Sequence, residues 1–232
     1  MTRFRGFVGV CCFALLLAAL GTPAHATIGT CDTAGPIEVE GSVLGTTPTA
    51  YATLAAAITA INGGTHTGVV EVEVCASSTE TAAMFLNSSG AGSASYTSLR
   101  IRPLVDGVTI SGPTVTGRGL IELNGADNVT IDGDNPNSGG TNRNLTIANT
   151  ATATIVANSV IRIATVATTV TSADNITIKN LIINGNVTGG NSSLITSTTG
   201  SSGISFGIFA GGGATAATTA PAALTAAAGT AA

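Results

Sequence analysis

The feature that most constrains the fold is an internal repeat built from short, alternating segments. Residues 126–131 (ADNVTI) recur 47 residues later as residues 173–178 (ADNITI), and residues 144–147 (NLTI) repeat the same core. Two further segments, 99–101 and 108–110, are echoed at offsets of 22 and 21 residues by 121–123 and 129–131. Short strands that repeat about every 20–25 residues are typical of a β-solenoid, in which each coil adds strands to parallel sheets.

The residue types suit such a coil. β-Branched and Leu side chains that point inward would stack on those of the next coil, so no helical layer is needed. Asn tolerates the left-handed conformation at a corner, and Asn128, Asn144 and Asn175 each precede a strand. Arg100 and Glu122 occupy matching positions in the repeat. We expect them to form an exposed ion pair, which would stabilise the fold little.

Composition excludes several other classes. The 232 residues are 44% hydrophobic, 9% charged and 3% aromatic. A disordered chain would be richer in charge, and this chain lacks the basic field and stacking aromatics that a nucleic-acid-binding protein needs. We therefore expect a folded chain that binds no nucleic acid.

Residues 1–26 have the pattern of a signal peptide. Arg3 and Arg5 precede an apolar run, and His25-Ala26 ends the small-x-small pattern before the expected cleavage site. Cleavage would leave 6 of the 8 basic residues against 12 acidic ones, a formal charge of −6. No later apolar run is long enough to span a membrane, so we expect a secreted or cell-surface protein.

Export would allow the two remaining cysteines, Cys31 and Cys75, to form one disulfide. That bond would tie the mature N-terminus to the end of the first clear strand. A zinc site is excluded because the mature chain has one histidine, His66, which we interpret as an exposed loop residue.

A short helix and a strand open the repetitive region. Thr49 is a candidate cap, Leu54, Ile58 and Ile61 share one helical face, and Asn62-Gly63-Gly64 provides the stop. In residues 70–74 three Val alternate with two Glu, which predicts a strand with one face in the core and the other in water.

Residues 119–133 (GLIELNGADNVTIDG) and 174–186 (DNITIKNLIINGN) resemble the right-handed parallel β-helix repeats of the pectate-lyase-like superfamily. The helix-then-strand opening is similar to that of large secreted bacterial β-helix proteins. The resemblance implies an all-β, right-handed parallel β-helix (solenoid) with a short N-terminal capping helix. The expected organisation is a signal peptide (1–26), an N-terminal extension (27–48), the β-helix (49–209) and a low-complexity Ala/Gly/Thr-rich tail (210–232).

The same resemblance also implies an alternative function, that of an enzyme. Pectate lyases of the superfamily hold calcium with clustered carboxylates and use Arg or Lys as the base. Asp127, Asp132 and Asp134 cluster near a Gly- and Asn-rich loop that offers oxygen ligands, so they are the candidate calcium ligands. The alternative interpretation of the loop is a solvated turn. No basic residue is assigned as catalytic.

We therefore expect a secreted or surface-exposed, non-catalytic β-solenoid module with a structural or adhesive role. Its partners would be surface glycans or cell-envelope components. The alternative is a calcium-dependent polysaccharide lyase-like enzyme. Because the uncharged tail after Phe209 shows no polar cap, we expect the chain to be the N-terminal portion of a longer protein.

Overall fold

The computed structural model describes residues 29–41, 48–115, 117–151, 158–165, 172–185 and 205–211. The predicted signal peptide and all but two residues of the predicted tail lie outside these ranges. The described strands form three sheets, A, B and C. Sheet A has the order β12 (Thr177–Lys179), β9 (Val129–Asp132), β6 (Tyr96–Pro103), β3 (Gly68–Val74), β1 (Ile37–Gly41), β2 (Thr49–Tyr51).

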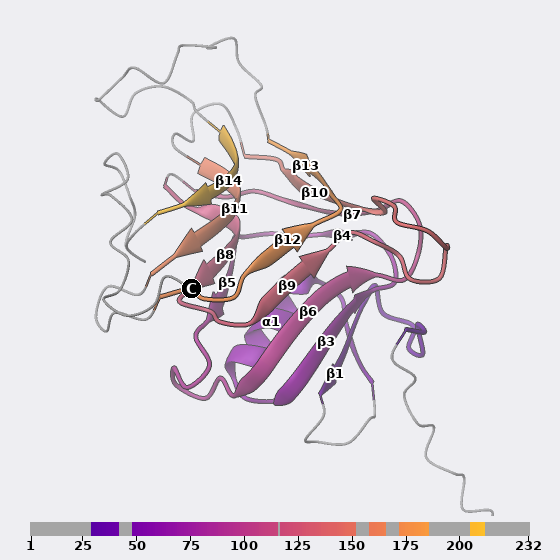
Figure 1. The fold of residues 1–232 in the computed structure, drawn as a ribbon, viewed down its shortest axis with the longest axis horizontal. Helices are drawn as coiled ribbons and strands as arrows, with labels where there is room; N and C mark the ends of the chain where they lie inside the picture. The colour runs from indigo at the N-terminus through magenta and orange to yellow at the C-terminus, as the bar shows by residue number, and fades with distance from the viewer. Residues whose placement is uncertain are drawn as a thin grey trace, which may run out of the picture.

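The other two sheets are also built from strands that lie three places apart in the chain. Sheet B has the order β13 (Leu181–Asn184), β10 (Leu145–Asn149), β7 (Val108–Gly112), β4 (Ser78–Thr79). Sheet C has the order β14 (Ser205–Ala210), β11 (Asn158–Ala164), β8 (Gly119–Asn124), β5 (Met84–Asn87). From β3 onward the chain visits A, B and C in turn, and each strand pairs in parallel with the strand three places later (Figure 1).

This arrangement is a parallel β-helix, so the predicted mainly-β solenoid is confirmed. The predicted coil of about 20–25 residues is too short. The register partners Glu71 and Arg100 are separated by 29 residues, and the stacked corners Asn128 and Asn175 by 47 residues. The ADN repeat therefore marks one full coil, whereas the two shorter echoes compare strands of different sheets.

The core is a set of side-chain ladders running through the coils. In sheet A, Val72, Ile101, Ile131 and Ile178 are paired in register from strand to strand. The first three are at most 1% exposed. Burying an aliphatic side chain of this size contributes roughly 1.5–3 kcal/mol, so the ladders are the main source of stability.

Two of the three predicted Asn corners are left-handed. Asn128 has φ 57°, Asn175 has φ 55°, and the Asn175 Nδ2 donates to Asn128 Oδ1 at 3.0 Å. Asn144 was predicted to do the same, but its backbone φ is not positive. Its side chain instead donates to Asp106 Oδ1 at 2.7 Å. The repeat therefore identifies a corner only where it begins a strand of sheet A.

We expect Asn128→Ala to lower the free energy of unfolding by about 1–2 kcal/mol, because an ordinary L-residue is strained in the left-handed region. Asn128→Gly keeps the backbone unstrained and should cost less, although it also loses the contact with Asn175. Urea denaturation of both variants checks this. Equal stability of the Ala and Gly variants would contradict the corner assignment.

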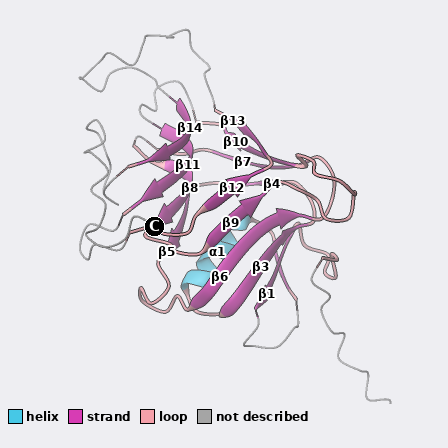
Figure 2. Ribbon diagram, viewed as in Figure 1, coloured by secondary structure: helices cyan, strands magenta, loops and turns pink. Residues whose placement is uncertain are grey.

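The N-terminal end of the coils is closed by three elements. β1 pairs antiparallel with β3 and with β2, so it covers the sheet edge that the first coil would otherwise expose. α1 (Leu54–Asn62) buries Leu54, Ala57, Ile58 and Ile61 and is the one helix among the described residues (Figure 2). β1 lies within the segment predicted to be an extension before the β-helix.

The helix begins where side chains satisfy its free amides. The predicted cap, Thr49, is wrong because Thr49 is part of β2; the cap is Thr53, whose Oγ1 accepts from Ala56 N at 3.1 Å. The buried Glu80 carboxylate accepts from Leu54 N and Ala55 N at 3.0 and 2.9 Å. A carboxylate at this end also complements the helix dipole, so Glu80 fixes α1 on the first coil.

Candidate functional site

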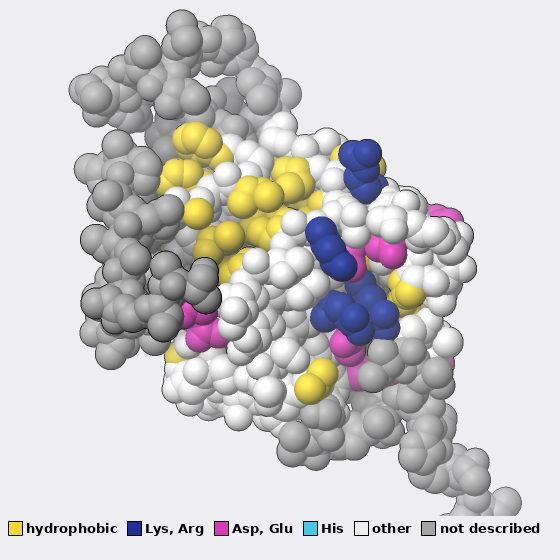
Figure 3. Space-filling view, viewed as in Figure 1, with side chains coloured by type: hydrophobic (Ala, Val, Ile, Leu, Met, Phe, Trp, Pro, Cys, Tyr) yellow, Lys and Arg dark blue, Asp and Glu magenta, His cyan; other side chains and the backbone are white. Residues whose placement is uncertain are grey.

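Strands β1, β3 and β6 of sheet A carry two rows of charged side chains, in which the glutamates are buried. The strand register places Glu38 beside Glu73 and Glu73 beside Arg102. It likewise places Glu40, Glu71 and Arg100 in one row. Basic and acidic side chains lie together on the face drawn in Figure 3. We call Asp32 and these four glutamates the cap cluster.

The two arginines neutralise the β3 side of the cap cluster. Arg100 Nε lies 2.8 Å from Glu71 Oε2, and Arg102 Nη2 lies 3.0 Å from Glu73 Oε1. Arg102 Nε also lies 3.8 Å from Glu71 Oε2. Burial raises the pKa of Glu73, although bonds from Gly29 N and Arg102 oppose that rise. Among the described residues, no arginine pairs with the β1 glutamates.

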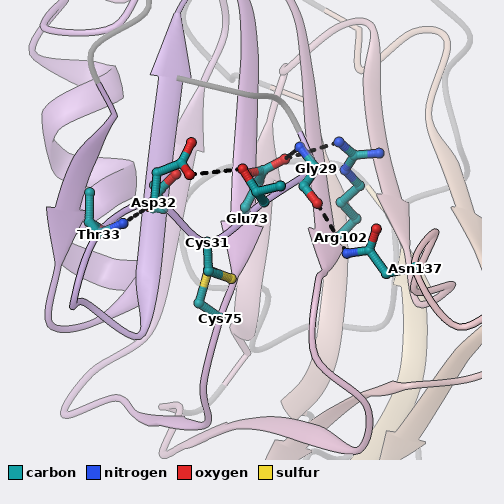
Figure 4. The surroundings of a disulfide bond; sticks show 10 residues. Gly29, Cys31, Asp32, Thr33, Glu73, Cys75, Arg102 and Asn137 are labelled. Atoms are coloured by element: carbon teal, nitrogen blue, oxygen red, sulfur yellow. Dashed lines mark hydrogen bonds and ion pairs between the residues drawn. A yellow bond between two sulfur atoms is a disulfide. The ribbon is translucent and has the colours of Figure 1, made fainter. Parts of the chain in front are cut away.

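The N-terminal segment covers the cluster. Cys31 is bonded to Cys75 at the end of β3, which holds residues 29–33 against sheet A (Figure 4). Gly29 N donates to Glu73 Oε1 at 2.7 Å, and Thr33 N donates to Glu38 Oε2 at 2.6 Å. Glu38 and Glu73 are fully buried. The prediction that this face of residues 70–74 is wet is therefore wrong, because the segment before β1 folds over it.

Several cluster oxygens are buried without a hydrogen-bond donor from the described part of the chain. They are Glu38 Oε1, both carboxylate oxygens of Glu40, and Glu73 Oε2. Asp32, Glu38 and Glu40 each present one oxygen within 4.8 Å of the others. Desolvation, together with the charges of Glu73, Glu38, Asp32 and Glu71, raises the pKa of Glu40 to about 7. Sequence reasoning missed this site.

In metal-free buffer we expect the protein to lose stability as the pH rises. The pKa of Glu40 is about 7 in the folded chain, against an ordinary value of 4.5, so the folded state holds the proton that the unfolded state releases between those values. The ionisation of Glu40 should therefore contribute a fall of about 3 kcal/mol to the free energy of unfolding between pH 4.5 and pH 7. The charged groups that act on Glu40 are Glu73, Glu38, Asp32 and Glu71, and the nearest arginines are paired with Glu71 and Glu73.

Urea denaturation of wild type and Glu40→Gln at pH 5 and pH 7.5 measures the contribution of Glu40, together with its coupling to the neighbouring acids, as a difference. The variant should be the more stable protein at pH 7.5. An identical pH dependence of the two proteins would contradict the raised pKa.

The three predicted calcium ligands are not brought together. Asp127 precedes β9 and Asp132 ends it, with the left-handed corner Asn128 between them. Within the described ranges the three aspartates do not form a group whose oxygens all lie within 4.8 Å of one another. Asp127 Oδ1 accepts from Asp174 N at 2.7 Å, and Asp134 Oδ1 accepts from Asn142 N at 2.7 Å.

Asp132 has donors of its own. Its carboxylate accepts from Asp134 N and Asn180 Nδ2 and pairs with Lys179 Nζ at 3.1 Å. The bonds from Asn180, Asp134 and Lys179 outweigh burial and lower the pKa of Asp132. In the described chain these aspartates organise corners and turns.

A second charged cluster lies on sheet C. Arg162 Nη1 lies 3.3 Å from Glu122 Oε2, and both side chains are at most 1% exposed. Arg118 Nη2 lies 2.8 Å from Glu122 Oε1, in a geometry that suits an ion pair but not a directional hydrogen bond. Burial raises the pKa of Glu122, against the attraction of Arg162 and Arg118. The predicted Arg100–Glu122 pair is therefore wrong, because the two residues lie on different sheets.

His66 is buried, contrary to the prediction of an exposed loop residue. It is 5% exposed, and its Nε2 lies 2.7 Å from the Tyr51 hydroxyl. Burial lowers the pKa of His66 and raises that of Tyr51. The pair joins β2 to the loop before β3 and has a structural role.

Comparison with known proteins found no matching family model, no similar curated protein and no similar solved structure. No helix in the described part of the chain is long and apolar enough to cross a membrane.

Proposed function

We propose that this chain is a secreted or surface-exposed, non-catalytic β-solenoid module with a structural or adhesive role. The observation that carries the proposal is the pairing of basic side chains within the described sheets. A lyase needs an Arg or Lys whose charge is available to the substrate, whereas five of the six basic residues in the described ranges are ion-paired with carboxylates.

The ion pairs cover most of the described cations. Carboxylates lie within 4.0 Å of five of them, namely Arg100, Arg102, Arg118, Arg162 and Lys179. Among the described residues Arg143 is the one basic side chain outside these pairs, and it lies exposed in the loop before β10. In each of these pairs a carboxylate already engages the positive charge, although the side chains of Arg100 and Lys179 are 41% and 53% exposed.

A disulfide persists best in an oxidising compartment, which favours export. The repeat resembles the pectate-lyase-like superfamily, whose fold hosts both enzymes and binding proteins, so the fold does not decide between them. Surface glycans and cell-envelope components are the proposed partners.

The test is an assay of turnover and binding on the same protein. We expect no release of unsaturated product from polygalacturonate or alginate, with or without calcium, and retention of the protein on immobilised envelope polysaccharide. Arg143→Ala serves as the matched variant and should leave the absence of turnover unchanged. Calcium-dependent turnover that Arg143→Ala abolishes would overturn the proposal in favour of the lyase.

A further inference from the structure

The cap cluster contains more buried negative charge than its partners neutralise. Four carboxylates, of Glu38, Glu40, Glu71 and Glu73, are at most 6% exposed. Asp32 lies beside them at the surface. Two arginines pair with Glu71 and Glu73. Among the described residues, no arginine pairs with the two β1 glutamates, Glu38 and Glu40.

Glu40 is the cap-cluster residue with the least hydrogen bonding in the described chain. Its side chain is 4% exposed, and neither carboxylate oxygen has a hydrogen-bond donor within the described chain. Leaving a buried polar group without a partner is costly, and leaving a buried charge without one costs more. The adjacent Glu38 Oε1 is also without a donor there. One carboxylate oxygen of Glu38 lies within 4.8 Å of one of Glu40.

The oxygens are placed as cation ligands would be. One oxygen each from Asp32, Glu38 and Glu40 lies within 4.8 Å of the other two, a separation that a shared ion can bridge. Alternation along β1 puts Glu38 and Glu40 on the same face of the strand. The disulfide at Cys31 positions the next residue, Asp32, above them, and its exposure gives an ion a route from solvent.

We propose that Asp32, Glu38 and Glu40 bind a calcium ion that fastens the N-terminal segment to β1. The donors are all carboxylate oxygens, which suits a hard cation, and calcium accepts irregular sets of mono- and bidentate carboxylates more readily than magnesium does. A divalent cation would supply the positive charge that the β1 glutamates lack within the described chain. The site differs from the Asp127, Asp132 and Asp134 set suggested by the sequence, and it holds whether or not the module binds glycans.

Calorimetric titration of the metal-free full chain with calcium chloride tests the site. We expect one calcium ion to bind, and the melting temperature to rise with calcium concentration, since a ligand that binds only the folded state stabilises it. Magnesium chloride at the same concentration should give a smaller rise. No binding of calcium, or an equal or larger effect of magnesium, would overturn the assignment.

Variants locate the ion. Glu40→Gln and Glu38→Gln each remove one ligand charge with little change in shape, and we expect each to weaken calcium binding by at least about 10–100-fold, the loss typical of removing even an outer-shell partner. Asp132→Asn is the matched control and should bind calcium as wild type does. Both glutamine variants should remain folded without metal because they lose repulsion. Calcium binding that survives Glu40→Gln, or that Asp132→Asn abolishes, would place the ion elsewhere.

Discussion

Arg162→Met should lower the free energy of unfolding by about 3–5 kcal/mol, the largest effect we expect from any single substitution. Arg162 is 1% exposed, and it faces the fully buried Glu122 across the β8–β11 pair. Removing the guanidinium deprives the buried Glu122 carboxylate of one of its two positive partners. Met retains most of the apolar stem of Arg162, so the loss of packing is small. The loss should fall near the lower end of the range because Arg118 still contacts Glu122.

Lys179→Met provides the matched comparison in urea denaturation. Lys179 also pairs with a strand neighbour, Asp132, but its side chain is 53% exposed. Solvent screens such a pair, so its removal should cost no more than about 1 kcal/mol. Similar losses in the two variants would show that burial does not set the strength of these pairs and would contradict the sheet C arrangement.

Cys31→Ser/Cys75→Ser should lower the free energy of unfolding by about 2–4 kcal/mol. The disulfide links residues 44 apart, so its loss restores conformational freedom to the unfolded chain. It also frees the segment whose amides at Gly29 and Thr33 donate to Glu73 and Glu38. These carboxylates would then become hydrated.

Differential scanning calorimetry with and without reductant isolates that contribution. Reductant should bring wild type down to the melting temperature of the double variant, and it should leave the double variant unchanged. A double variant as stable as oxidised wild type would contradict the idea that this bond holds the N-terminal segment on the cap cluster.

The pattern of short alternating segments was enough to predict the solenoid, because the inward-facing side-chain ladders require apolar residues at matching positions of successive coils. The ADN-apolar-Thr-Ile repeat at 126–131 and 173–178 identified two stacked corners. The coil length was misread because β-branched alternation is common to all three sheets. Matching residues 99–101 with 121–123 compared β6 with β8, which lie on different sheets.

The cap cluster could not be predicted in the same way, because it depends on a long-range contact. Glu alternates with apolar residues in both β1 and β3, and this pattern alone indicates an exposed face. What buries it is the segment from Gly29 to Thr33, which the disulfide carries back over the sheet. The Glu-x-Glu pair at 38 and 40, repeated at 71 and 73, was the available signal that two acidic strands lie side by side.

Chemical cross-linking of engineered cysteines tests the register of the coils, which defines the β-helix fold. Thr130 lies beside Thr177 in the observed register, but it would lie beside Thr109 if the shorter echo in the sequence marked one coil. Both pairs are introduced with Cys11 and Cys12 changed to Ser, and a short bifunctional thiol reagent is mapped by mass spectrometry. We predict that Thr130→Cys/Thr177→Cys cross-links within one chain and that Thr109→Cys/Thr130→Cys does not. The opposite result would contradict the β-helix described above.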